Sequence, residues 1–111
     1  APKVRIRPPS RRHREFTVPT QVNYLRPLQP SKRTLMELVA LDTPGLLARI
    51  GSVFSRLSLN LHAAKITTIG ERVEDFFSLT NNEHQPLTDA QQQQLRDEII
   101  AELKKGEISP P

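Results

Sequence analysis

Two helical patterns and four strand-like patterns of apolar residues alternate along the chain. The first helical pattern follows Pro44, where apolar residues recur at the three- and four-residue spacing of one helix face. These residues are Leu46, Leu47, Ile50, Val53, Phe54 and Leu57. The second pattern begins with the capping-box spacing of Thr88-Asp89-Ala90-Gln91 and ends at Lys104-Lys105-Gly106. Its apolar stripe consists of Leu95, Ile99, Ile100 and Leu103.

Strand patterns occupy the intervals before and between these helices. Thr34–Asp42 is apolar on both alternating faces, which indicates a central strand. Leu59–Ile69 and Val73–Thr80 are rich in β-branched and aliphatic residues and are separated by a short turn that starts at Gly70, so they predict a hairpin. Phe16–Leu25 alternates around a proline, which is typical of an edge strand because proline cannot donate to a sheet ladder.

The order of these elements predicts an α+β fold. Without its first strand the order is βαββα, one strand short of the ferredoxin-like unit βαββαβ, whose last strand lies antiparallel beside the first. Residues 106–111 are too short and too proline-rich to supply that last strand. We therefore predict a domain over residues 15–105 in which residues 15–25 take the vacant edge. The result is a four-stranded antiparallel sheet with both helices on one face.

Composition is that of one small globular domain. The chain has 111 residues, of which 36% are apolar and 25% charged. No apolar run approaches the roughly 18 residues of a membrane span, so we expect no membrane binding. The absence of cysteine excludes disulfides and thiol chemistry and fits a cytoplasmic location. Proline-rich polar sequence at both ends indicates a piece of a longer chain.

The net charge of +4 is unevenly distributed. Residues 1–33 contain nine Lys or Arg against Glu15 alone, a net charge of +8, whereas residues 34–111 contain seven against eleven acids, a net charge of −4. The basic character therefore belongs to the leading segment, of which residues 1–14 are typical of an inter-domain linker. Such an arm is either solvated or a docking element for an acidic partner.

Residues suited to catalysis or metal binding form no recognisable motif. His13, His62 and His84 are far apart and lack the spacing of metal ligands. There is no nucleophile elbow and no glycine-rich phosphate loop, although a triad recognised by geometry alone stays open. The acids among residues 71–75 are typical of a solvated turn. We expect no catalytic residue and no metal site in this chain.

Sheets of this size can also bind single-stranded RNA through exposed aromatic residues on a basic strand. Here the corresponding run, Val73-Glu74-Asp75-Phe76-Phe77, is acidic where a phosphate-facing strand is basic, and its phenylalanines suit a core. We therefore expect no nucleic-acid binding.

The strongest candidate for a ligand site is the turn between the central strand and the first helix. A helix N-terminus has free N–H groups and a partial positive charge that suit a carboxylate, and Asp42 beside it could meet an ammonium group. Asn60, polar among aliphatic residues, can both donate and accept hydrogen bonds. Two interpretations stay open at this point. Either these residues bind an amino acid between subunits, or Asn60 ends the helix and the turn is ordinary, with Thr43 as the helix cap and Pro44 in its first turn.

The run Asp-Thr-Pro-Gly-Leu-Leu from Asp42 to Leu47, followed by its helix, by Asn60-Leu61 and by the hairpin, resembles the ACT domain. This is a family of small regulatory modules that bind amino acids, and the likeness extends from about Thr34 to Lys104. The resemblance implies a ligand site shared with a neighbouring ACT domain or a homodimer mate. The residues that would line it are Asp42, Gly45, Leu46, Leu47, Asn60 and His62.

A narrower resemblance is carried by three segments. Residues 36–49 and 62–75, most distinctively Ile66–Asp75, are similar to the last ACT domain of the bifunctional PII uridylyltransferase/uridylyl-removing enzymes. Ser10–Phe16 resembles the segment that joins their two ACT domains. This implies glutamine as the ligand, PII as the protein partner of the parent enzyme, and a role in nitrogen control. It also implies magnesium-dependent transferase and hydrolase domains outside this sequence. The alternative is an interaction module that binds no ligand and docks through its basic arm.

Overall fold

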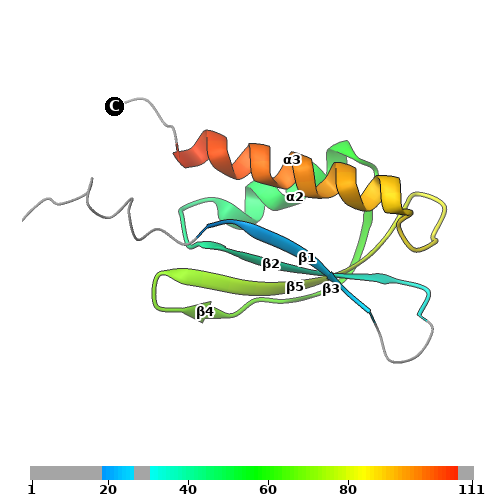
Figure 1. Cartoon of the computed structure of the whole chain (residues 1–111), viewed down its shortest axis with the longest axis horizontal. Helices are drawn as coiled ribbons and strands as arrows, with labels where there is room; N and C mark the ends of the chain where they lie inside the picture. The colour runs from blue at the N-terminus through cyan, green and yellow to red at the C-terminus, as the bar shows by residue number, and fades with distance from the viewer. Residues whose placement is uncertain (1–18, 27–30, 108–111) are drawn as a thin grey trace, which may run out of the picture.

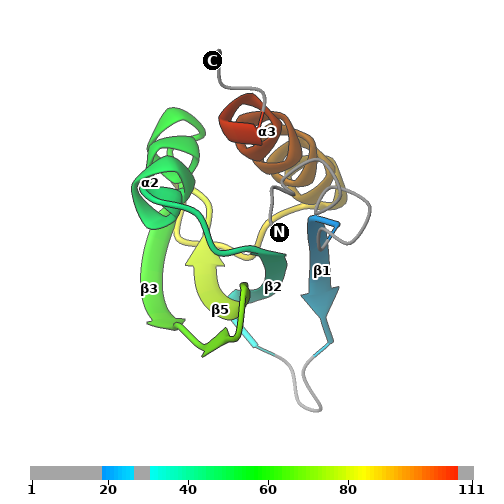
Figure 2. The same cartoon turned by 90° about the vertical axis from the view of Figure 1, so that its left-hand side faces the viewer.

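One layer of antiparallel strands is covered on one face by two helices in the computed structural model, which describes residues 19–26 and 31–107 (Figure 1). The elements are β1 (Gln21–Leu25), β2 (Thr34–Leu41), α2 (Leu46–Arg56), β3 (Asn60–Lys65), β4 (Thr68–Ile69), β5 (Arg72–Thr80) and α3 (Asp89–Glu107). The sheet order is β1-β2-β5-β3, and β4 also pairs with β5. Figure 2 shows α2 above β3 and α3 above β1. The predicted ferredoxin-like α+β sandwich is confirmed, with a short fifth strand added to the expected four.

β1 takes the edge position predicted for the N-terminal strand. It pairs antiparallel with β2, with Tyr24 opposite Met36. The strand begins at Gln21, after Pro19 and not around it, because a proline would leave a gap in the ladder. The predicted strand residues 15–18 lie outside the described residues.

The core lies between the sheet and the helices. Phe54 of α2 packs edge-on against Phe77 of β5, with ring centroids 5.4 Å apart and an interplanar angle of 76°, an arrangement that ring quadrupoles favour. The Tyr24 hydroxyl donates to the Gln92 carbonyl at 2.8 Å and ties β1 to α3. The largest fully buried apolar side chains are Met36, Leu38, Ile50, Val53, Leu79, Leu95 and Ile99. Together these contacts fix the helices over the sheet.

α3 begins with the predicted capping box. Thr88 Oγ1 accepts the Gln91 N–H at 3.1 Å, and Gln91 Oε1 accepts the Thr88 N–H at 2.9 Å, so each residue satisfies a donor of the other. The helix ends one residue beyond the predicted Gly106. The predicted linker 1–14 and residues 108–111 of the tail lie outside the described residues.

α2 begins differently from the prediction. The Leu46 N–H donates to the Thr43 carbonyl at 3.2 Å, and Gly45 has φ 76° and ψ 10°. These values define a type II turn with Pro44 at its second position and glycine at its third. Gly45 directly precedes the helix and no side chain caps it, so the prediction of a Thr43 cap with Pro44 in the first turn is wrong. The turn preference of Pro-Gly outweighs the hydroxyl cap. Leu47, expected on the apolar face, is 49% exposed.

The predicted strand Leu59–Ile69 is divided into β3 and β4. The register to β5 is the same on both sides of the break. Within the break, the Thr67 carbonyl accepts the Glu74 N–H at 2.8 Å, but the Thr67 N–H donates to the Asp75 carboxylate at 3.1 Å. The Asp75 side chain therefore replaces a backbone carbonyl as the acceptor of one ladder hydrogen bond, and the regular strand is interrupted there.

Alanine substitutions at two glycines test the turn before α2. A Cβ added at Gly45 or at Gly51 meets no heavy atom within 4 Å, so the two positions differ in backbone conformation and not in space. Gly45→Ala should lower the free energy of unfolding by about 1 kcal/mol, because an L-residue is strained at positive φ. Gly51→Ala, within α2, should raise it by about 0.5–1 kcal/mol, because alanine is the better helix former.

Equilibrium unfolding in urea measures both changes. A Gly51→Ala chain that loses as much stability as the Gly45→Ala chain would contradict this description of the turn.

Candidate ligand site

A hollow of about 310 Å³ lies between the start of α2 and the β4–β5 hairpin. Both segments lie at the left-hand end of Figure 1 and toward the viewer in Figure 2. The Asp42 N–H donates to the Glu71 carbonyl at 2.8 Å and holds the end of β2 against the hairpin turn. The volume is at the lower end of the range of ligand pockets and suits a small metabolite.

Four of the six residues predicted to bind a ligand line this hollow. They are Asp42, Gly45, Leu46 and Leu47. They come together because the type II turn places the end of β2 directly before the first turn of α2. The opposite wall comes from the β4–β5 hairpin and the break before it, and consists of Ile66, Thr68, Val73 and Asp75.

The first turn of α2 forms the positive end of the hollow. Leu47 and Ala48 line it, and their main-chain N–H groups have no acceptor among the described residues. The neighbouring N–H groups, of Leu46 and Arg49, are bonded within the turn. No side chain caps the helix and no acidic residue lies in its first turn. Free N–H groups aligned with the helix dipole attract a carboxylate.

Two carboxyl groups supply negative charge, Asp42 beside the turn and Asp75 on the opposite wall. Asp42 is exposed, whereas Asp75 is fully buried, with 0% of its surface exposed. Asp75 Oδ1 accepts the Thr67 N–H at 3.1 Å, and Oδ2 has no hydrogen-bond partner among the described residues. Burial raises the pKa of the Asp75 carboxyl above its ordinary value, the Thr67 N–H lowers that pKa and the nearby Asp42 raises it.

Asp75 is the site residue that the sequence analysis missed. The acids of residues 71–75 were expected in a solvated turn, and for Asp75 this expectation is wrong. Its position on β5 alternates with the buried Val73 and Phe77, so its side chain points toward the helices. Glu74 fits the expectation better, because it lies on the other face and forms an ion pair with Arg72 at 2.9 Å. An acid in phase with buried apolar residues of a strand is the pattern that could have revealed the site.

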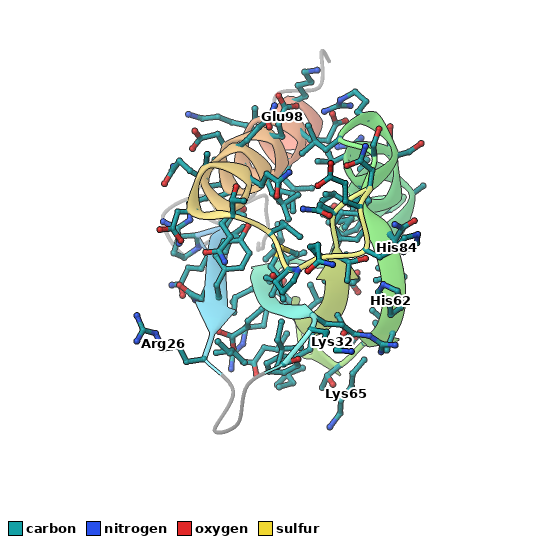
Figure 3. The ribbon with its side chains drawn as sticks, turned by 90° about the vertical axis from the view of Figure 1, so that its right-hand side faces the viewer. Arg26, Lys32, His62, Lys65, His84 and Glu98 are labelled. Atoms are coloured by element: carbon teal, nitrogen blue, oxygen red, sulfur yellow. The ribbon has the colours of Figure 1, made fainter. Side chains whose placement is uncertain are left out.

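The remaining two predicted residues lie at the other end of β5. Asn60 Nδ2 donates to the Asn81 carbonyl at 3.1 Å, and His62 Nε2 lies 2.8 Å from Thr80 Oγ1. Figure 3 views this end and shows His62 on β3, on the side of the molecule that carries His84. Within one chain they do not reach the hollow. Their predicted place opposite a neighbouring subunit's turn stays a prediction.

The side chains that line the hollow are suited to binding a charged ligand and include few groups suited to catalysis. They include two carboxyl groups and two threonines, without histidine, lysine or arginine. Among the residues that the structure describes, no group of three or more His, Asp or Glu residues could hold a metal ion. In the same part of the chain, no helix combines the length and the apolar character needed to cross a membrane. The hollow is therefore suited to a small molecule that carries both charges.

The sequence that forms the sheet, the helices and the hollow is similar to that of known proteins. A match to the family described as "ACT domain" covers residues 34–104. The chain belongs to the ACT domain family. The matched part of this ACT domain begins at β2, so the edge strand β1, which completes the sheet, precedes it.

Relatives of this ACT domain include three proteins named bifunctional uridylyltransferase/uridylyl-removing enzyme. The one from Photobacterium profundum is 58% identical over 88 residues, which cover 79% of this chain and 10% of the relative. The one from Vibrio cholerae is 55% identical over 95 residues, which cover 86% and 10%. The one from Vibrio campbellii is 52% identical over 101 residues, which cover 91% and 11%. The chain thus spans about a tenth of the length of these relatives.

Removal of the buried carboxyl should change the pH dependence of stability. Because the pKa of Asp75 is raised above 3.8 in the folded chain, the unfolded chain loses this proton first as pH rises. The native chain should therefore lose stability relative to an Asp75→Asn chain as pH rises from 3.8 through the raised pKa of Asp75. Above that pKa, the difference in free energy of unfolding between the two chains should no longer change with pH.

Urea unfolding at a series of acidic and neutral pH values measures this difference. Glu74→Gln, which removes the same charge from the other face of β5, is the matched control. A difference between the native and Asp75→Asn chains that does not vary with pH would contradict a raised pKa.

Proposed function

We propose that this ACT domain binds a free amino acid, glutamine, in the hollow and is a sensing domain of a bifunctional uridylyltransferase/uridylyl-removing enzyme. The observation that carries the proposal is the presence of two opposite poles in one small hollow. Free N–H groups of Leu47 and Ala48 form one pole, and the carboxyl groups of Asp42 and Asp75 form the other. The carboxylate and ammonium of an α-amino acid are complementary to this pair of poles.

The relatives support the assignment to a parent enzyme. Their name describes addition and removal of a uridylyl group, and about half of this chain's residues are identical to theirs over most of its length. In our proposal the modified protein is PII, the enzyme is cytoplasmic, and magnesium serves a transferase domain outside this sequence. The ACT domain itself binds the effector and takes no part in the chemistry.

Regulation requires that glutamine distinguish two arrangements of the parent enzyme. A ligand shifts an equilibrium only by its difference in affinity for the two states. Leu47 and Ile66 line the hollow and are 49% and 45% exposed, so they offer apolar surface at its rim. In our proposal, a neighbouring ACT domain or a homodimer mate covers this rim when glutamine is bound.

A titration followed by NMR tests glutamine binding. L-Glutamine added to the ¹⁵N-labelled 111-residue chain should shift the amide signals of Leu47 and Ala48 in a saturable manner, because these N–H groups would bond its carboxylate. The amides of Thr80 and Asn81, at the far end of β5, should not move within one chain. A titration that moves no amide of the turn would contradict the proposal.

A charge-removal series tests the role of Asp42. Asp42→Ala should weaken glutamine binding about two- to fivefold, the size expected for one solvent-exposed charge pair. Asp97→Ala is the matched control, because it removes the same charge from an exposed position on α3. Isothermal titration calorimetry measures both chains. Equal affinities for the Asp42→Ala chain and the native chain would remove Asp42 from the site.

A further inference from the structure

We infer that Asp75 accepts the nitrogen donor of the bound ligand and selects against a ligand that places a carboxylate there. The inference rests on the proposed function and deepens it, because it assigns the specificity of the same hollow. The sequence-based site did not include this residue.

One oxygen of the buried Asp75 carboxyl group is unpaired among the described residues. Nearly all buried polar atoms in native proteins have a hydrogen-bond partner, and a buried carboxylate oxygen without one is costly. Asp75 lines the hollow and is fully buried, with Oδ1 bonded to Thr67 and Oδ2 without a partner among the described residues. The bond to Thr67 fixes the plane of the carboxyl group, so Oδ2 is held in place for a donor.

Asp75 and Asp42 differ in their exposure to solvent. Asp42 is exposed, so water competes for its carboxylate and a bond to it discriminates weakly between ligands. Asp75 is shielded from water, where a charge-assisted hydrogen bond is stronger and an opposing carboxylate is more strongly repelled. Asp42 adds a second negative charge close by, which increases that repulsion.

Asp75 lines the hollow but is closed off from solvent. Asp75 Oδ2 has no contact with solvent, so side chains around it must move before a ligand reaches it. Leu47 and Ile66 are about half exposed and both line the hollow, so they can change rotamer without disturbing the core. Rim movement of this kind also fits a site that closes around its ligand.

The ligand group that meets Asp75 is an N–H donor. An ionised carboxylate only accepts hydrogen bonds, so its partner must donate. Glutamine carries two such groups, the α-ammonium and the side-chain amide. Glutamate lacks the side-chain amide and would bring a side-chain carboxylate toward Asp42 and Asp75. In either orientation the carboxylate of the ligand lies at the start of α2 and its nitrogen at Asp75.

The test exchanges the acceptor for a donor. In an Asp75→Asn chain the Thr67 N–H still requires an acceptor, so the amide oxygen takes the place of Oδ1 and the NH₂ group takes the place of Oδ2. Glutamine affinity, measured by calorimetry on the 111-residue chain, should fall about 10- to 100-fold. Glu74→Gln, one residue away on the opposite face, should leave the affinity unchanged.

Other ligands identify the nitrogen that Asp75 binds. If the α-ammonium meets Asp75, the Asp75→Asn chain loses affinity for glutamine, glutamate and alanine alike. If the side-chain amide meets it, the loss is confined to glutamine, and glutamate gains affinity because its carboxylate now meets a donor. The first result supports Asp75 as the acceptor of the ligand nitrogen and overturns the selection against a side-chain carboxylate, whereas the second supports both parts of the inference. An Asp75→Asn chain that is folded and binds glutamine as the native chain does would overturn it.

A measurement on the native chain keeps the inference testable if the variant does not fold. Glutamine should shift the Thr67 amide and the ¹³C signal of the Asp75 carboxyl carbon. If the Leu47 and Ala48 amide signals shift and these two signals do not, the ligand site is retained but the role of Asp75 is overturned.

Methylammonium chloride separates failure of the inference from failure of the proposed function. If no amino acid moves any signal of the hollow, the proposed function fails. In that case a shift of the Thr67 amide with methylammonium still supports Asp75 as an acceptor for nitrogen donors. No shift with methylammonium would overturn that role as well.

Discussion

The free N–H groups at the start of α2 depend on the backbone conformation of Gly45. With φ at 76°, this residue turns the chain sharply enough that α2 starts directly after β2, without a side-chain cap. A serine, threonine or aspartate cap would bond one of these groups and partly neutralise the dipole. The turn therefore leaves a helix end that is both uncapped and adjacent to an acidic wall, and the candidate ligand site follows from this.

The rest of the fold holds that helix end and that wall in fixed positions. β2 and β5 are paired over the full length of β2, so the end of β2 and the start of β5 lie side by side. The Asp42 N–H bond to Glu71 fastens them at the edge of the hollow. Behind the hollow, α2 is anchored by the contact of Phe54 with Phe77. A shift of α2 along the sheet would disturb this core, so the contact opposes movement of the helix end relative to the wall.

The parts of the fold that could be predicted from the sequence are those determined by local patterns. The capping box of Thr88 and Gln91 is a four-residue feature, and the apolar stripe after it sets the buried face of α3. The edge position of β1 followed from a missing strand and a short connection. The start of α2 could not be assigned correctly, because Thr43 and Pro44 fit either a cap or a type II turn, and only the positive φ of Gly45 decides between them.

Only part of the candidate site could be predicted, because some of its residues are close in sequence and others are brought together by strand pairing. Residues near the turn are close in sequence, so the turn itself brings Asp42, Gly45 and Leu47 together. Asp75 is 33 residues from Asp42 and joins them through strand pairing, and its buried position depends on the phase of β5. The predicted roles of Asn60 and His62 involve a second subunit, which the folding of one chain does not specify.

A crystal structure of the chain with L-glutamine tests the central claim most directly. The account predicts the ligand carboxylate within hydrogen-bond distance of the Leu47 and Ala48 N–H groups and a ligand nitrogen at Asp75 Oδ2. Glutamine bound elsewhere, or bound with its carboxylate toward Asp75, would contradict it.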